Sequence, residues 1–446
     1  MKGCVVLKFG GTSVSTRERW ENIEKIAASY LEKGEHPFIV CSAVSGVSNL
    51  LEALLPLAVK GEHAEQLDAI YQKHKVLADA LELDLEEYIK PELELIQRVA
   101  HGASLTQEVS PRLHAMVMSC GELMSTKLGV AFLSREGGVL HGNVSWEDAR
   151  DHLRAVSTQE GERNLTRHYL SARCGFEPSK EMQAKIEAKE EKVTITQGFI
   201  ACDSEGHTVL LGRGGSDTSA AYFASILEAS RLEIWTDVPG MFTANPRQVP
   251  SARLLKKLSY KEAQELASMG AKVLHPRCLD PVKQGQIPLH IRCTQQPELD
   301  GTVVSAQAAD VGAQVKAIST KSGIPLISME TLGMWHQVGF LADVFQTFKS
   351  HGLSIDQVAT SETNVTVSLD PVANALDSKA LDALLKSLTQ FCHAKRIGPC
   401  AAVSLVGQNI RAILHKLGPV LEAFEEHHIY MVSQSSSDLN ITFVVA

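Results

Sequence analysis

The sequence predicts an α/β protein in which a large layered domain is followed by two small ferredoxin-like modules. Through about the first three hundred residues, short apolar runs typical of strands alternate with amphipathic helical patterns, which indicates a sheet covered by helices. From about residue 310 the pattern changes to short strands around two amphipathic helices, and a β-α-β-β order occurs twice. At 446 residues the chain is also longer than one hydrophobic core usually serves.

The layered domain is expected to begin with a strand at Val5–Lys8, a helix, and a second strand at Phe38–Ala43. Ser15 and Glu18 have the spacing of a capping box at the start of that helix, and Gly34 fits its end. The apolar face of the helix comprises Trp20, Ile23, Ala27, Tyr30 and Leu31.

A polar and charged helical pattern from Gly61 to Gln107 predicts a helical lobe inserted into this domain. Ser259 and Glu262 offer a second capping box, for a helix that Gly270 could end. Strands are expected to resume at Val193–Ile200, Thr208–Leu211, Glu233–Thr236 and Ile287–Ile291.

The helices of the repeated units are expected at Ala342–His351 and Ile410–His427. The strands around them are Gly323–Ile327, Ser354–Val358 and Asn364–Leu369 in the first unit, and Ala402–Val406, Ile429–Ser433 and Asn440–Val445 in the second. Paired modules of this kind usually form a regulatory region rather than a second active site.

Composition argues against several classes of protein. A formal net charge of −9 disfavours a nucleic-acid partner, because such proteins normally carry a basic patch. The nine cysteines form no CxxC pair and no cluster at zinc spacing, as expected of reduced thiols in the cytoplasm. The most apolar stretch, Leu50–Val59, is short and carries Glu52, and the chain opens in a strand-like run. We therefore expect no membrane partner and no signal or transit peptide.

The loop that follows the first strand has the parts of a phosphate site. Lys8 supplies a positive charge, and Gly10 and Gly11 let backbone N–H groups approach an anion ahead of a helix N-terminus. A strand followed by two glycines also occurs in ordinary tight turns, so this loop alone does not establish a phosphate site.

The second glycine-rich loop, Gly212–Asp217, is more specific. It holds three glycines and Arg213, whose guanidinium can bind two oxygens of a carboxylate or phosphate at once. Asp217 could merely cap the following helix, but a cap needs neither three glycines nor an arginine.

Two later segments also lie where a strand or helix is expected to end. Trp235–Gly240 breaks into a loop that leads to Arg247, at the position where an open α/β sheet usually binds its ligand. Met269–Pro276 offers a second lysine, Lys272, which could equally be a solvated surface residue.

Two earlier segments could contact a substrate. Ser42–Asn49 is a hydroxyl-rich loop after a strand. In Ser119–Ser125 a lone carboxylate, Glu122, stands in an apolar stretch that is expected to start a helix. This acid could be favoured there by the helix dipole, or it could hold a substrate ammonium group.

Absent motifs exclude other kinds of enzyme. There is no GxxxxGK[ST] sequence of a P-loop ATPase, no HRD or DFG of a protein kinase, and no HExxH metalloprotease motif. What remains is a phosphoryl-transfer site built from glycine loops and lysines, acting by positioning and charge neutralisation.

Six of these segments, taken in order, resemble the successive signatures of aspartate kinases. They are Val6–Val14, Ser119–Ser125, Ile195–Ile200, Gly212–Asp217, Trp235–Gly240 and Gly270–Pro276. The resemblance extends from Lys8 to the last residues, and it implies a three-layer amino-acid-kinase fold followed by two ACT modules of the βαββαβ type. It also implies that ATP and Mg²⁺ react with L-aspartate to give 4-phospho-L-aspartate and ADP.

The same resemblance implies roles for individual residues. Lys8 would neutralise the transferring phosphoryl group and Asp217 would organise the reacting groups. Glu122 would hold the substrate ammonium and Arg213 its α-carboxylate. Further substrate contacts would come from Ser42, Ser48, Phe199 and Ser216. The nucleotide would contact Lys8, Gly10, Gly11, Ser13, Thr236, Asp237, Phe242, Arg247 and Lys272, and no residue is assigned as a metal ligand.

Two residues depart from the family pattern. Phe242 stands where the family often has tyrosine, which removes a hydroxyl contact to the nucleotide. Ser48 stands where threonine is common, which keeps the hydroxyl.

The substrate carboxylate is already ionised at pH 7, so the reaction needs no general base.

The carboxyl-terminal region resembles the ACT modules of feedback-inhibited aspartate kinases, with lysine favoured over threonine as effector. Asp356 and Glu362 could receive the amino groups of the effector, although Asp356 could also be a plain loop acid. The implied effector site comprises Met334, Gln337, Phe340, Leu341, Ser354, Ile355, Asp356, Thr360 and Glu362.

The expected domains are 1–308 for catalysis, 309–397 for the first ACT module and 398–446 for the second. The second module looks truncated, its first strand could come from 313–322, and the chain could be the front part of a fused bifunctional enzyme. Exposed sheet edges in such modules invite a homodimer or higher homo-oligomer. A glutamate-type kinase and a catalytically silent ACT sensor with a kinase fold stay open as alternatives.

Overall fold

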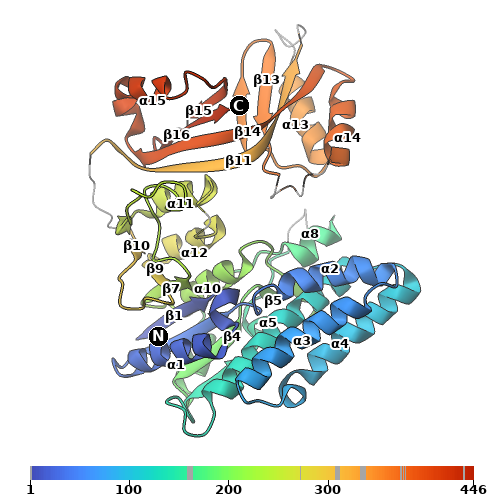
Figure 1. The fold of residues 1–446 in the computed structure, drawn as a ribbon, viewed down its shortest axis with the longest axis vertical. Coiled ribbons are helices and arrows are strands. Elements are labelled where there is room, and N and C mark those ends of the chain that lie inside the picture. The colour runs from blue at the N-terminus through green and yellow to red at the C-terminus, as the bar shows by residue number, and fades with distance from the viewer. Residues whose placement is uncertain are drawn as a thin grey trace. The chain divides into compact units, whose positions relative to one another are not determined.

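The computed structural model describes residues 3–157, 164–271, 273–306, 312–331, 338–371, 374, 376, 378–434 and 437–446. The chain forms two compact units (Figure 1). The first unit comprises Met1–Met241, Leu254–Ala263 and Lys272–Ala308, and the second comprises Phe242–Arg253, Gln264–Ala271 and Ala309–Ala446.

The first unit is built on an eight-stranded sheet with the order β3-β4-β2-β1-β7-β9-β10-β8. In that order the strands are Val144–Glu147, Val193–Gln197, His36–Cys41, Cys4–Phe9, Arg231–Thr236, Leu289–Cys293, Thr302–Val304 and Lys257–Leu258. The six strands from β3 to β9 are parallel, and β10 runs antiparallel to β9. Val5, Val6 and Leu7 of β1 are fully buried because parallel sheets are covered on both faces.

Helices cover both faces of this sheet. On one face, Phe223 of α10 (Gly215–Ile226) packs against Phe38 of β2 with ring centroids 5.0 Å apart. On the other, α1 (Arg17–Leu31) crosses α5 (Pro111–Leu133) so closely that a Cβ atom on Gly129 would lie 2.0 Å from the Trp20 ring (Figure 1). The predicted three-layer α/β architecture is confirmed.

The helical lobe predicted for Gly61–Gln107 is also confirmed, since α3 (Ala64–Ala80) and α4 (Leu85–Thr106) lie in that range. Helix α2 (Val47–Val59) precedes them and packs against α3, α4 and α5. Helix α5 is long and apolar enough to cross a membrane by length and composition, but 78% of its apolar window is buried inside the structure. The remaining elements of the first unit are η1 (Gly11–Val14), α6 (Ala149–His152), α8 (Leu165–Leu170), α9 (Lys180–Glu187), β5 (Ile200–Cys202), β6 (Thr208–Leu210), η2 (Pro276–Cys278) and α12 (Leu279–Gln284).

One of the two predicted capping boxes is present. At the start of α11 (Tyr260–Ser268), Ser259 N donates to Glu262 Oε2 at 2.8 Å and Glu262 N donates to Ser259 Oγ at 3.2 Å. The box predicted at Ser15 is wrong, because Thr16 caps α1 by accepting a hydrogen bond from Arg19 N. Ser15 makes other contacts, which are described below.

The second unit is a six-stranded antiparallel sheet with the order β12-β13-β11-β14-β16-β15. In that order its strands are Gln357–Thr360, Asn364–Ser368, Gln314–Glu330, His393–Gln408, Asn440–Val445 and Ile429–Gln434. Strands β11 and β14 pair along their whole length, from Gln314 beside Gln408 to Glu330 beside His393. One half of this long pair borders β13 and the other half borders β16, so two ferredoxin-like half-sheets share both strands.

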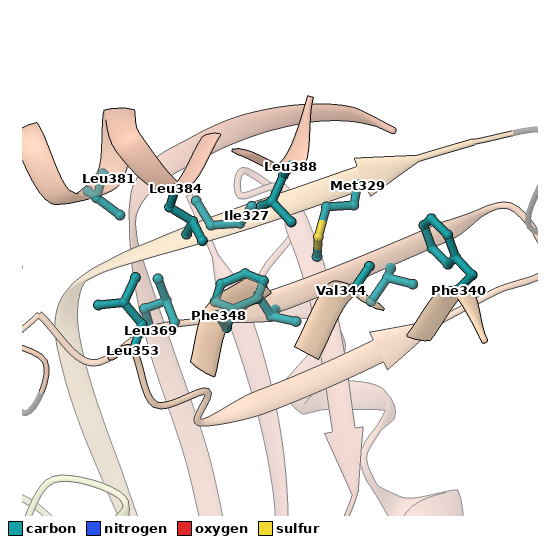
Figure 2. Packing of buried hydrophobic residues seen from close by; sticks show 12 residues of the cluster. Ile327, Met329, Phe340, Val344, Phe348, Leu353, Leu369, Leu381, Leu384 and Leu388 are labelled. Atoms are coloured by element: carbon teal, nitrogen blue, oxygen red, sulfur yellow. The ribbon is translucent and has the colours of Figure 1, made fainter. Parts of the chain in front are cut away.

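The first half-sheet carries two helices, α13 (Phe340–Ser350) and α14 (Ser378–Leu388), whose apolar faces form one core with the sheet (Figure 2). Val344 and Phe348 of α13 face Leu384 and Leu388 of α14 across this core. Helix α13 confirms the predicted helix at Ala342–His351, whereas α14 was not foreseen among the individual elements.

Two predicted elements of the second unit need correction. The continuous helix expected at Ile410–His427 is wrong, because a 3-10 helix, η4 (Ile410–Lys416), is followed by the short α15 (Gly418–Glu422). Pro419 has no N–H to continue the hydrogen-bond ladder, so a helix can start there but cannot pass through. The strand expected to start at Ser354 starts at Gln357.

Two segments from the catalytic part of the sequence belong to the second unit. Thr243 O accepts a hydrogen bond from Ile318 N at 2.8 Å, and Met269 O accepts one from Ser319 Oγ at 2.9 Å. Glu265 is hydrogen-bonded to Asn440 of β16. The continuous domain boundaries expected from the sequence stay a prediction.

Candidate active site

The carboxyl ends of the central parallel strands meet at one edge of the sheet and carry the predicted site loops. Phe9 at the end of β1 lies beside Cys41 at the end of β2 and Trp235 near the end of β7. Cys41 in turn lies beside Gln197 at the end of β4. The loops that follow these strands are therefore neighbours, as the rule for ligand sites in open α/β sheets predicts.

A pocket of about 650 Å³ opens among these loops, within the size range of small-molecule sites. It is lined by Lys8, Ser42, Ser48, Glu52, His114, Met118, Glu122, Leu170, Phe199, Leu210, Gly212, Arg213, Gly214, Gly215, Ser216 and Asp217. The structure thus brings together every residue that was predicted to act in catalysis or to bind the substrate.

Lys8 and Asp217 form an ion pair in this pocket. Lys8 Nζ lies 2.6 Å from Asp217 Oδ1, and the two side chains are 13% and 14% exposed. Asp217 does not cap α10, since the capping residue is Gly214 and no side-chain hydrogen bond closes that helix end. The carboxylate therefore holds the lysine ammonium at the end of β1, where it faces the pocket.

The loop Gly212–Asp217 is tightly packed from behind. Gly214 has a φ of +64°, and a Cβ atom there would lie 2.1 Å from the His275 ring. Arg277 Nη1 donates a 2.6 Å hydrogen bond to Leu211 O at the start of the loop. These contacts explain the need for glycine in this loop and hold Arg213 at the pocket.

Replacing Gly214 with alanine is expected to lower kcat/KM about 100-fold, because the loop must move by a large part of an ångström to clear His275. The matched control is Gly206→Ala, since Gly206 has a φ of +85° but open space around it. That control carries the backbone strain without the displacement and should keep its activity. Equal activity in both variants would contradict the importance of this packing, and steady-state kinetics on the two proteins decides it.

Glu122 lies in the middle of α5, not in a first turn, so the helix-dipole interpretation of this acid is wrong. It is 3% exposed; Oε1 accepts a 3.3 Å hydrogen bond from Ala43 N, and Oε2 is buried without a hydrogen-bond partner among the described residues. Burial raises the pKa of Glu122 from 4.5 to about 8. A buried acceptor of this kind in a pocket is suited to a ligand cation.

Arg213 provides the complementary charge. Its side chain is exposed at the pocket, and no ion-pair partner is present for it within the described ranges. One pocket therefore offers a carboxylate without a cation at Glu122 and a guanidinium without an anion at Arg213, besides the Lys8–Asp217 pair. An α-amino acid carries the two matching groups on one carbon atom.

Of the predicted nucleotide residues in the first unit, Lys8 lines the pocket, and Ser13, Thr236 and Asp237 belong to a chain of hydrogen bonds. Ser13 is buried, and its Oγ lies 3.1 Å from Thr294 Oγ1, which donates to Thr236 O at 3.2 Å. Thr236 in turn donates to Asp237 Oδ1 at 3.1 Å. Ser13 does not line the pocket. Its hydroxyl links the first loop, through Thr294, to Thr236 at the end of β7.

The roles predicted for the other nucleotide residues stay predictions. Phe242 is half-buried and Arg247 is exposed, and both belong to the second unit. Lys272 lies outside the described residues.

The sequence interpretation missed Glu52, His114 and Met118 of the pocket wall. His114 Nε2 lies 2.9 Å from Glu52 Oε2, and this contact holds the pKa of Glu52 below its ordinary value. Helical spacing could have revealed them, because Glu52 lies one turn after Ser48, and His114 and Met118 lie two turns and one turn before Glu122.

The predicted effector residues divide into several groups. Asp356 Oδ2 lies 3.4 Å from Lys321 Nζ, which also pairs with Asp370 at 2.5 Å; burial raises the pKa of Asp356. Phe340 is buried in the hydrophobic core of the first half-sheet, and the partly buried Ile355 packs against this core. The other described members are Leu341, Thr360 and Glu362, which are exposed, and Ser354, whose backbone N donates to Asn374 Oδ1. Met334 and Gln337 lie outside the described residues.

The sheet and the pocket together are those of an α/β enzyme that assembles a small-molecule site from loops at the carboxyl ends of parallel strands. Residues 3–293 match the model of the amino acid kinase family. The whole chain is 34% identical to the lysine-sensitive aspartokinase 3 of Escherichia coli and covers 96% of that protein.

Comparison with solved structures also finds an aspartokinase. The chain covers 96% of E. coli aspartokinase III in complex with aspartate and ADP in the R-state, with a TM-score of 0.82 at 32% identity over 99% of this chain. It covers 96% of the same enzyme with lysine and aspartate in the T-state, with a TM-score of 0.76 at 31% identity over 100% of this chain. The chain therefore belongs to the amino acid kinase family and, within it, to the aspartokinases.

Proposed function

We propose that the pocket transfers the γ-phosphoryl group of ATP to the side-chain carboxylate of L-aspartate, giving 4-phospho-L-aspartate and ADP. The observation that carries this is the unpaired Oε2 of Glu122, buried in the same pocket as Arg213 and the Lys8–Asp217 pair. Aspartate and ADP are bound together in the E. coli relative, which supports the same substrates here. The family membership supports the same reaction class.

The proposed roles follow from charge. Glu122 receives the α-ammonium group and Arg213 holds the α-carboxylate with its two-pronged guanidinium, which leaves the side-chain carboxylate free to attack. Lys8 neutralises charge on the transferring phosphoryl group, and Asp217 keeps the lysine in place. No base is required, because the attacking carboxylate is already ionised at neutral pH. Catalysis is then a matter of alignment and electrostatics.

Magnesium would enter this site with the nucleotide. Within the described ranges, no group of three or more His, Cys, Asp or Glu side chains could hold a metal ion alone. Mg²⁺ usually keeps several waters and is held largely by the phosphates, so an ion that enters with the nucleotide needs no such group of protein ligands. When bound, the ion neutralises phosphate charge.

Release of ADP with L-aspartate, L-glutamate or no acceptor tests the proposed reaction. We expect ADP only with L-aspartate. ADP with L-glutamate instead would favour a glutamate-type kinase, and no acceptor-dependent ADP would favour a silent sensor with a kinase fold.

We also propose that L-lysine inhibits the enzyme through the second unit, with Asp356 receiving an amino group of the effector. The lysine-sensitive relative supports this effector. The variant Asp356→Asn should keep its turnover without lysine and need at least about tenfold more lysine for half-inhibition, because a charged hydrogen bond is lost. Asp382→Asn, an exposed acid of α14, is the matched control. An unchanged lysine response in Asp356→Asn would remove this residue from the effector site.

A cytoplasmic location and assembly into a homo-oligomer through the second unit are part of the proposal. All nine cysteines are free thiols and eight are buried, which suits a reducing compartment.

A further inference from the structure

The loops that follow β1 and β2, beside the pocket, approach each other at their backbones. The loop that follows β1 carries Gly10 and Gly11 beside Lys8, and the loop that follows β2 carries Ser42. A Cβ atom on Gly11 would lie 2.7 Å from Ala43 O, so no larger residue fits at this crossing. In the proposed reaction the first loop serves the phosphates and the second serves the acceptor.

Ser15 joins these two loops by its side chain. Its Oγ donates to Gly11 O at 2.5 Å and accepts a hydrogen bond from Ser45 N at 2.9 Å. One hydroxyl group therefore satisfies a carbonyl of the first loop and an amide of the second. Ser15 is half-buried and does not line the pocket, so it does not touch the substrates there.

The second loop is also fixed from its outer side. Lys73 of α3 donates a 2.8 Å hydrogen bond to Ser45 O, the carbonyl of the residue whose amide binds Ser15. The next residue, Gly46, has a φ of +80° and is the N-cap of α2, which carries Ser48. Ser45 is thus hydrogen-bonded to Ser15 through its amide and to Lys73 through its carbonyl. These two bonds fix the backbone just before α2.

We infer that Ser15 is a positioning residue that aligns the acceptor loop with the phosphate loop for the transfer step. This rests on the proposed function, because it assigns the two loops to the two reactants. An in-line transfer is sensitive to sub-ångström displacement of one reactant relative to the other, whereas each loop could still bind its own ligand if the link were lost. Ser15 should therefore influence kcat and leave both KM values nearly unchanged.

The test compares Ser15→Ala, Ser15→Thr and Thr16→Ala in the full chain by steady-state kinetics and thermal unfolding. Ser15→Ala is expected to lower kcat about tenfold with KM for aspartate and ATP changed less than about twofold. Ser15→Thr keeps the hydroxyl and should recover most of kcat. Thr16→Ala removes the adjacent cap of α1 and should lower Tm while kcat stays unchanged. Lys73→Met should repeat the Ser15→Ala effect in weaker form, because its hydrogen bond is exposed.

The outcomes separate this inference from the proposed function. If Ser15→Ala lowers Tm and leaves kcat unchanged, Ser15 is structural and the inference is overturned. If Ser15→Thr fails to recover kcat in a protein with normal Tm, the hydroxyl is not the active feature and the inference is also overturned. If Lys8→Ala is as active as the wild type, the proposed site itself is wrong, whatever Ser15 does.

Discussion

Replacing Lys8 with alanine should lower kcat by about 10² to 10³, the usual effect of removing one preorganised charge from the transition state. Lys8 Nζ is 2.6 Å from Asp217 Oδ1 and nearly enclosed, so bulk solvent cannot easily supply the missing charge. The variant also leaves Asp217 as an unpaired anion beside the phosphates, which adds repulsion to the lost attraction. Lys8→Arg should recover only part of the rate, because a guanidinium differs from an ammonium in size and geometry.

Initial rates of ADP release at saturating aspartate and ATP measure this effect. The matched control is Lys60→Ala, an exposed lysine at the end of α2, which should behave as the wild type. Wild-type turnover in Lys8→Ala would place the transferring phosphoryl group elsewhere.

Replacing Glu122 with glutamine should raise KM for aspartate by roughly 30-fold to several thousandfold, while KM for ATP stays near its wild-type value. The amide keeps the shape but not the charge, and losing one partner of a buried charged pair typically weakens binding by about 2 to 5 kcal/mol. The wild type should also bind aspartate better as pH rises toward 8, because Glu122 must lose its proton to hold the ammonium group. Glu122→Gln should lack this pH dependence. A parallel loss of affinity for ATP would contradict an acceptor-specific role.

The same substitution should stabilise the ligand-free protein at alkaline pH. The pKa of Glu122 is raised by burial from 4.5 to about 8, so the folded protein keeps a proton that the unfolded chain releases. The stability conferred by that protonated carboxyl is complete below pH 4.5 and is lost as pH rises to about 8. Glutamine does not titrate, so Tm of Glu122→Gln should exceed that of the wild type at pH 8.5 by more than at pH 5. An equal difference at both pH values would argue against a buried, proton-binding Glu122.

Much of the catalytic architecture could be predicted, because local signals and the fold agree. The apolar run before Lys8, the three glycines after Leu211 and the capping box at Ser259 each have one dominant structural outcome. Parallel strands then bring their carboxyl ends together, so loops that are far apart in sequence meet without any signal linking them.

The features that the sequence interpretation placed wrongly or missed each have a physical cause. Ser15 and Thr16 are adjacent hydroxyl residues that can both cap a helix, and only the approach of Ser45 N decides that Ser15 serves a different purpose. Glu122 was expected near a helix start because the helix boundary at Ser110 and Pro111 was not used. The Glu52–His114 contact depends on the packing of α2 against α5, which no local pattern encodes.

The shared strands of the second unit have a consequence for how its two half-sheets behave. Because β11 and β14 run continuously through both, no flexible linker separates the halves, and neither can rotate as a free module. The two halves are therefore one continuous sheet, in which the pairing register of β11 and β14 shifts between Ser322 and Leu326. In the proposed regulation, an effector bound at Asp356 would therefore act on a sheet whose two longest strands also form the other half-sheet.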